Sequence, residues 1–321
     1  MRGFSRFGAA IAVALVALAA RAPAQTLESA RKAVETRDWP TARAELDALI
    51  QARNATAMVM LGRLHAEPGG TGPFAENLAL ACNMFERAAN LNAPEGMLLL
   101  ADCFSQGRGR PQDFAEARRL YQGAGDRGMA RAWCAIGRQY FLGQGTAVDG
   151  SRGLALCRQG SSMGDGDADA EVGLRFLRGD VLTQSFADAK PWLERAAQRG
   201  NGPAARELGE VYWSGKGVPR DRVAAVRYFE QAARAGDLDA AWRYARYRRD
   251  TVFTSTNVPS DRRAAVDALY WLTVVGKFHP EAKLRSQAEN EVETLRGLFP
   301  DLVQLLDHRL YNDPFLGKPL R

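Results

Sequence analysis

The sequence is poor in the residues that bind metal ions. Its 321 residues include three histidines and four cysteines. His65, His279 and His308 are far apart in the chain, and none has another metal-ligating side chain at a spacing that would bring both to one ion. We therefore expect no metal, and nothing in the sequence points to a cofactor.

An excess of charge of one sign is also lacking. The chain has 43 Lys and Arg against 37 Asp and Glu, which gives a net charge of +6. Removal of residues 1–24, which contain three arginines and no acid, would leave +3. So small a surplus does not favour nucleic acid as the main partner, because nucleic-acid binding depends on a strongly basic surface.

Long apolar runs are absent except near the N-terminus, at residues 7–20. This run is too short for a transmembrane helix. It follows Arg2 and Arg6 and precedes the small residues Ala22 and Ala24, an arrangement typical of a secretory signal peptide cleaved near Ala24. We expect a periplasmic or secreted protein with no integral membrane segment after cleavage. The alternative is that the run remains as an uncleaved anchor.

Three short motifs match those of enzymes or metal sites, but each lacks the context that its chemistry needs. Residues 160–164 match G-x-S-x-G without a preceding strand, and residues 29–32 match S-x-x-K without a later S-D-N or K-T-G. Residues 165–169 resemble the start of a calcium loop, but Ala170 and Phe176 occupy the places of the required Gly and acid. We therefore predict that the protein is not an enzyme, and we name no catalytic residue.

The sequence does contain one pattern that recurs about every 36 residues. In its clearest copy, residues 204–240, an amphipathic helix ends at Gly215 and Gly217, and a second helix follows the N-capping residue Asp221. The Gly-x-Gly turn is interpreted as a helix stop, because the strand and the Lys-Ser/Thr of a phosphate loop are missing. Two such short helices cannot bury their apolar stripes alone, which predicts copies stacked side by side.

Columns of matching residues support this register. Steps of 36 residues back from Gly209 always meet a small residue, which lets a neighbouring helix approach closely: Gly173, Gly137 and Ala101. An aromatic residue stands three positions after each small residue. This aromatic column consists of Phe104, Tyr140, Phe176 and Tyr212, and Arg248 takes the corresponding place in the last copy.

The pattern A-x3-LG-x2-Y-x2-G-x-GV-x2-D-x3-A-x6-AA-x2-G resembles the Sel1-like repeat, a variant of the tetratricopeptide repeat, over residues 55–282. The resemblance implies an all-α fold, an α-solenoid in the form of a right-handed superhelix of helix-turn-helix repeats. Members of this family are mostly adaptors or scaffolds, so the resemblance also implies binding of a protein partner, regulation or holding of another cell-envelope protein, and no catalysis.

The same resemblance leaves one enzymatic alternative. A Cys-rich branch of the family is associated with penicillin binding and β-lactamase activity, which implies a penicillin-interacting hydrolase. That branch has a Cys pair in most repeats, whereas this chain has four Cys in all. The predicted organisation is a signal peptide at 1–24, an N-terminal helical hairpin cap at 25–54, six repeats at 55–280, and C-terminal capping helices and a tail at 281–321.

The four cysteines allow three disulfide pairings. Two antiparallel helices place residues equidistant from their shared turn side by side. Cys82 and Cys103 are centred on the turn at 91–94, and Cys134 and Cys157 on the loop at 143–150. We therefore predict the bridges Cys82–Cys103 and Cys134–Cys157; the alternative is four buried free thiols.

A partner is expected to bind the first helices of the repeats, on the side away from the core stripe. Aromatic and arginine side chains dominate binding hot spots. The candidates of this kind are Arg138, Phe141, Trp213, Trp242, Arg246 and Arg249. The basic run at 243–249 suggests a partner with an acidic segment that docks on the fifth and sixth repeats. The alternative is that the two tryptophans pack between repeats and that the arginines form a solvated face.

The disulfide prediction can be tested by mass. Intact protein isolated from its native compartment will gain no alkyl groups before reduction and four after reduction and unfolding. Four thiols that react without reductant would contradict both bridges.

Overall fold

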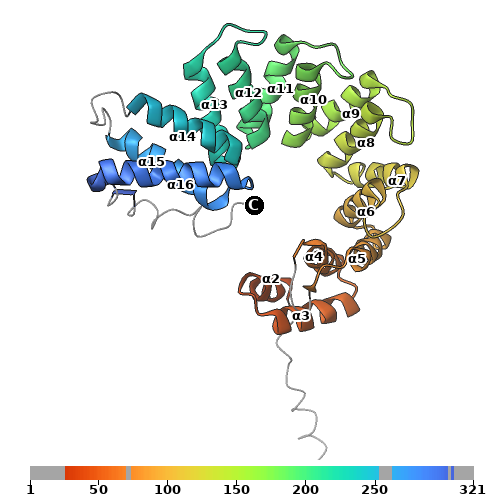
Figure 1. Ribbon diagram of the computed structural model, residues 1–321. Coiled ribbons are helices and arrows are strands. Elements are labelled where there is room, and N and C mark those ends of the chain that lie inside the picture. The colour runs from red at the N-terminus through yellow and green to blue at the C-terminus, as the bar shows by residue number, and fades with distance from the viewer. Residues whose placement is uncertain (1–25, 70–73, 253–261, 303–304, 307–321) are drawn as a thin grey trace, which may run out of the picture. The chain divides into compact units, whose positions relative to one another are not determined.

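A computed structural model describes residues 26–69, 74–252, 262–302 and 305–306 (Figure 1). The predicted signal peptide, the predicted long loop at 251–260 apart from its first two residues, and the tail beyond residue 306 are outside the described residues. Within those ranges the regular elements are helices joined by turns, which confirms the all-α prediction. None of these helices combines the length and the apolar composition that crossing a membrane would need.

The chain divides into two compact units after Ala132, near the start of the third predicted repeat. The helices of the first unit are α2 (Leu27–Glu35), α3 (Trp39–Gln51), α4 (Ala55–Ala66), α5 (Leu78–Asn90), α6 (Pro94–Gln106) and α7 (Phe114–Gly125). Those of the second are α8 (Ala130–Leu142), which starts just before the division, α9 (Gly150–Ser162), α10 (Gly166–Arg178), α11 (Phe186–Gln198), α12 (Gly202–Ser214), α13 (Arg222–Arg234), α14 (Leu238–Val252), α15 (Arg262–Phe278) and α16 (Ala282–Leu298).

The first unit begins with a hairpin, α2 and α3, and continues with the pairs α4–α5 and α6–α7. Asp38 caps α3 by accepting a hydrogen bond from the backbone N–H of Thr41. Ala42 and Leu46 of α3 are fully buried and pack in one cluster with Met58 of α4. The predicted hairpin is therefore present, and its role as a cap remains a prediction.

The second unit follows the repeat pattern closely. Gly215 ends α12 with a φ of 72°, a left-handed conformation that glycine adopts without strain. The Asp221 carboxylate then caps α13 by accepting from the Ala224 N–H at 2.9 Å. A Cβ on Gly209 would lie 2.6 Å from the Phe229 ring, so the small residue is what lets α12 and α13 pack so closely. The predicted helix-turn-helix repeat is confirmed.

Both predicted cysteine pairs are joined. Cys82 of α5 bonds Cys103 of α6, and Cys134 of α8 bonds Cys157 of α9, each with its Cα atoms within 6.2 Å. Each bridge ties two antiparallel neighbours across the turn on which the pair is centred, as the spacing predicts. A bridge over a loop of this length contributes roughly 3 kcal/mol, mainly by restricting the unfolded chain.

A buried carboxylate links three consecutive helices of the second unit. Asp169 of α10 is 0% exposed. It accepts a hydrogen bond of 2.6 Å from the Ser161 hydroxyl of α9, and it forms ion pairs with Arg195 and Arg199 of α11. Both arginines are partly exposed, so their charge reaches water while the carboxylate depends on protein donors.

This network predicts a large difference between two aspartates of the same unit. Asp169→Ala should lower the free energy of unfolding by about 3 kcal/mol, because the buried Ser161 hydroxyl and two arginines lose the charged acceptor that they share. Asp180→Ala removes a partner of Arg175 that is 40% exposed, and should cost less than about 1 kcal/mol. Urea unfolding followed by circular dichroism measures both; equal effects would show that burial of Asp169 contributes nothing.

Candidate functional site

The predicted binding residues of the fifth and sixth repeats, with the exception of Arg249, surround a groove on the second unit. A cavity of about 630 Å³ is lined by α12, by α14, by Phe229 of α13 and by Leu284 of α16. The lining includes three of the six predicted contact residues, Trp213, Trp242 and Arg246. We call this cavity the groove.

The sequence of α14 explains why these side chains face the groove. Ala241, Tyr244 and Ala245 are buried and form the apolar stripe that packs on the neighbouring helices. Trp242 and Arg246 are one helical turn apart on another side, so they lie next to each other at the surface. A core stripe on one side therefore leaves an aromatic and basic strip on the other.

The groove combines aromatic rings with arginines. The Arg246 guanidinium lies over the Trp242 ring, 5.3 Å from its centroid, while half of its side chain remains exposed. Trp213 packs edge-on against Tyr247 at 5.9 Å. A guanidinium held over a ring keeps its N–H groups free to bind a carboxylate, because the contact uses the face of the guanidinium and not its edge.

Arg249 is committed to the fold rather than to the groove. Its guanidinium pairs with Asp250 at 2.6 Å and with Glu291 of α16 at 2.6 Å. Burial lowers the pKa of Arg249, but hydrogen bonding to Asp250 and the charge of Glu291 outweigh burial and raise it. Only 23% of the side chain is exposed, so Arg249 anchors α16 beside α14.

The structure corrects the prediction for Phe141. This side chain is 2% exposed and packs in a cluster with Cys157 and Val172, so a surface contact is wrong. The reason is Gly153 on α9, where a Cβ would lie 2.6 Å from the Phe141 ring. The gap left by glycine draws the ring into the core, although its position in the repeat matches that of half-buried Trp213.

Arg138 is exposed as expected but lies outside the groove. It is on α8 and forms an ion pair of 3.3 Å with Glu171 of α10. Sequence reasoning missed Tyr247 and Leu284, which also line the groove. Tyr247 belongs to the basic run at 243–249, whereas no pattern in the sequence places a residue of α16 at the groove.

The enzyme-like motif at 160–164 has no catalytic environment. It forms the end of α9, where the Ser162 hydroxyl donates to the Gln159 carbonyl at 2.7 Å, as a helix-terminal serine commonly does. A nucleophile elbow would need a strand-to-helix turn. The described ranges also hold no group of three or more His, Cys, Asp or Glu side chains that could bind a metal ion.

Burial and charge compete at Glu210, on the same helix as Trp213. Its carboxylate pairs with Arg243 at 2.5 Å, which would normally lower its pKa. Burial instead raises the pKa of Glu210 above its usual value, and Arg243 opposes this without cancelling it. Burial therefore disfavours the ionised Glu210 carboxylate more than Arg243 favours it.

These features define an α-helical repeat protein with an aromatic and basic groove. The family model of the Sel1 repeat matches residues 55–92, 94–129, 130–165, 166–201 and 202–237. The matches cover more than half of the chain, which belongs to the Sel1 repeat family. Proteins of this family generally serve as scaffolds for protein–protein interactions. The sixth predicted repeat is not among the matched segments, although α14 and α15 form a packed pair there.

Two curated relatives share part of the sequence. An uncharacterised protein of Neisseria meningitidis is 32% identical over 146 residues, which is 46% of this chain and 30% of that protein. The mouse DAP3-binding cell death enhancer 1 is 28% identical over 162 residues, which is 50% of this chain and 31% of that protein. The chain thus matches about a third of the length of these relatives.

Two solved structures share the fold. A Sel1 repeat protein from Oxalobacter formigenes has a TM-score of 0.60 at 20% identity, covering 78% of this chain and 99% of that one. A protective antigen of uropathogenic Escherichia coli has a TM-score of 0.52 at 23% identity, covering 87% and 61%. At this level of identity the similarity shows the fold alone.

The raised pKa of Glu210 gives a test with a definite sign. The folded state favours the protonated acid, so this contribution to stability is present below the unfolded pKa of about 4.3 and is lost as pH rises through the raised folded pKa. Glu210→Gln, which mimics the protonated form, should be at least as stable as the wild type at pH 7 and should lose that advantage at pH 4. Urea midpoints at both pH values measure it; a clear loss of stability at pH 7 would mean that the Arg243 pair outweighs burial.

Proposed function

We propose that this protein is an exported scaffold that holds a segment of another cell-envelope protein in the groove. The observation that carries the proposal is the gathering of Trp213, Trp242 and Arg246 around one cavity of about 630 Å³. Such a cavity is large enough for several side chains of a bound peptide. Rigid aromatic rings beside an arginine are the usual composition of a binding hot spot.

The charges of the groove favour an acidic segment at one place, beside Arg246, since Asp239 and Asp250 also line the cavity. Arg206 is paired with Asp237 at 2.9 Å and Arg243 with Glu210 at 2.5 Å, so both are neutralised by the fold. Arg246 lies 3.9 Å from Glu291, and its half-exposed guanidinium has N–H groups to spare. A carboxylate of the partner would pair with Arg246 while an apolar neighbour rests on Trp242. Arg249 is not among the proposed contacts, because it already pairs with Glu291 of α16.

Export is supported by the cysteines and by the N-terminal pattern. Two disulfides are typical of proteins that fold in an oxidising compartment such as the periplasm. Residues 1–24 have the composition of a signal peptide, and the proposed mature chain begins at Gln25. The proposed order after cleavage is a hairpin cap, six repeats and a capping C-terminal segment.

Capture of partners from the periplasmic fraction tests the groove. The wild type, Trp242→Ala and Arg246→Glu are compared with Arg178→Glu, a matched charge reversal at an exposed position of α10. At least one protein should be recovered by the wild type and by the α10 control, and about tenfold less by both groove variants, because each loses a hot-spot contact of order 1–2 kcal/mol.

Equal recovery by all four proteins would refute the groove as the binding site. The same preparations decide the hydrolase alternative, since hydrolysis of nitrocefin by the pure wild-type protein would point to catalysis instead of binding.

A further inference from the structure

Three aromatic rings pack together between α11 of the fourth repeat and α12 and α13 of the fifth repeat. Tyr212 of α12 stacks on Tyr228 of α13, with ring centroids 5.7 Å apart. It also packs edge-on against Phe186 of α11 at 6.1 Å. These rings fill the region where α11, α12 and α13 meet.

One repeat later, none of the three corresponding positions holds a ring. Arg222 and Arg248 stand 36 residues after Phe186 and Tyr212, and Ala268 corresponds to Tyr228 once the four extra residues of the loop before α15 are counted. Arg222 turns away to lie over the Trp213 ring at 5.3 Å. Ala268 is buried and too small to replace a tyrosine.

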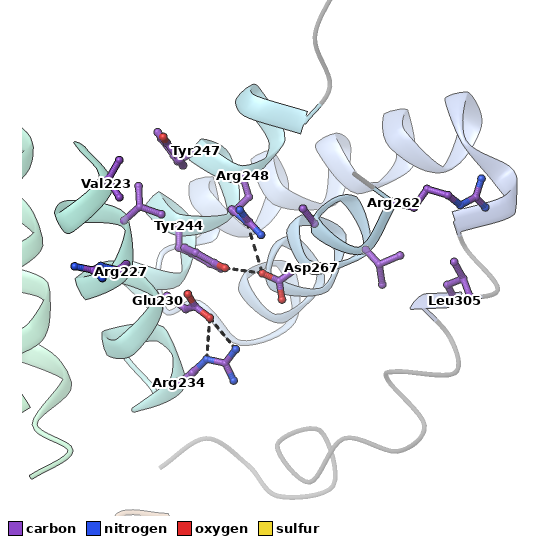
Figure 2. Close-up of a pocket in the computed structure, with 13 residues that line it drawn as sticks. Val223, Arg227, Glu230, Arg234, Tyr244, Tyr247, Arg248, Arg262, Asp267 and Leu305 are labelled. Carbon is purple, nitrogen blue, oxygen red and sulfur yellow. Dashed lines mark hydrogen bonds and ion pairs between the residues drawn. The ribbon is translucent and has the colours of Figure 1, made fainter. Parts of the chain in front are cut away.

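Of the three positions, Arg248 lines a cavity of about 900 Å³ between α13, α14 and α15 (Figure 2). Tyr247 is the one residue that lines both this cavity and the groove. The cavity is therefore a separate site, reached from another side of α14. Its volume is in the range of pockets that hold small ligands or short peptide segments.

The middle of the cavity is charged. Asp267 accepts a hydrogen bond of 2.7 Å from the Tyr244 hydroxyl and lies 4.0 Å from Nε of Arg248 (Figure 2). That Nε is buried and has no hydrogen-bond partner. Because 4.0 Å is too long for a hydrogen bond, the Arg248 guanidinium is only weakly held by Asp267.

The remaining charges leave a positive surplus. Glu230 is neutralised by Arg234 at 2.8 Å, and Arg262 pairs with Asp301 at 2.5 Å. Arg227 forms no ion pair with any residue in the described ranges. Apolar side chains stand beside these charges, since Val223 is 68% exposed and Leu305 is 48% exposed.

We propose that this cavity binds an acidic peptide segment of a partner protein. One carboxylate of the segment pairs with Arg248 and satisfies the N–H groups that Asp267 reaches poorly, and a second carboxylate pairs with Arg227. Apolar side chains next to that carboxylate cover Val223 and Leu305. Replacement of the column's aromatic residue by Arg248 thus gives the sixth repeat a second site for the kind of segment that the groove is proposed to hold. This second proposal does not depend on the groove.

The test restores the missing ring. Arg248→Phe places in the sixth repeat the type of residue that the aromatic column has elsewhere, and Arg248→Gln removes the charge while it leaves the cavity open. The probe is a fluorescein-labelled peptide, acetyl-Leu-Glu-Leu-Asp-Glu-Leu-amide, with a twin in which Gln and Asn replace Glu and Asp. Fluorescence anisotropy at physiological ionic strength measures the affinity of both peptides.

The wild type should bind the acidic peptide at least tenfold more tightly than the neutral twin. Both Arg248 variants should lose about tenfold or more, as expected for a lost charge-assisted contact. Arg178→Ala, which removes one charge from the exposed end of α10, should bind like the wild type. The Arg248 variants are also compared in a Trp242→Ala background, which weakens binding through the groove, and their loss of affinity should remain.

Several results would overturn the proposal. They are equal binding of the two peptides, unchanged binding by Arg248→Gln, and an equal loss in Arg178→Ala, which would indicate a non-specific charge effect. Displacement of the peptide by inorganic phosphate at matched ionic strength would assign the cavity to phosphate instead. Failure of the groove variants in partner capture leaves this measurement untouched, so the two sites are tested apart.

Discussion

The close contact between a small residue on one helix and a bulky side chain on its partner determines the geometry of each repeat. Phe229 packs on Gly209, and Leu193 packs on Gly173, where a Cβ would lie only 2.6–2.7 Å from the opposing side chain. This contact brings the helices of a pair close together, and the glycine turn with its capping aspartate fixes where the second helix begins. The apolar faces that one pair of helices leaves uncovered then pack against the next repeat.

Where the repeat departs from this scheme, the chain gains surface chemistry. In the fourth and fifth repeats, the rings of Phe186, Tyr212 and Tyr228 pack against one another. The sixth replaces the column residue by Arg248, and charged side chains surround the opening that results. On another side of the same helix, Trp242 and Arg246 face the groove. One helix, α14, therefore contributes to both proposed sites.

Much of the fold could be predicted because it depends on short-range patterns. Helical periodicity, the glycine stops and the 36-residue register all act within one repeat, so the sequence alone indicates the pairs from α4–α5 to α14–α15. The disulfides followed for the same reason, since equidistance from a shared turn brings Cys82 to Cys103 and Cys134 to Cys157. The site was only partly predictable, since three of its candidates, Trp213, Trp242 and Arg246, line one groove, whereas Phe141 is in the core and Arg249 is used by α16.

The sequence by itself determined the class of fold, the helix-turn-helix pairs and the cysteine pairs, because each of these follows from the identity and spacing of residues near one another in the chain. Only the tertiary structure decided which side chains remain available to a partner. That outcome depends on what the neighbouring helices bring: Gly153 leaves room that Phe141 fills, Glu291 neutralises Arg249, and Asp267 of α15 lies beside Arg248 in an open cavity. Burial and charge pairing across helices are long-range properties, and a local pattern does not record them.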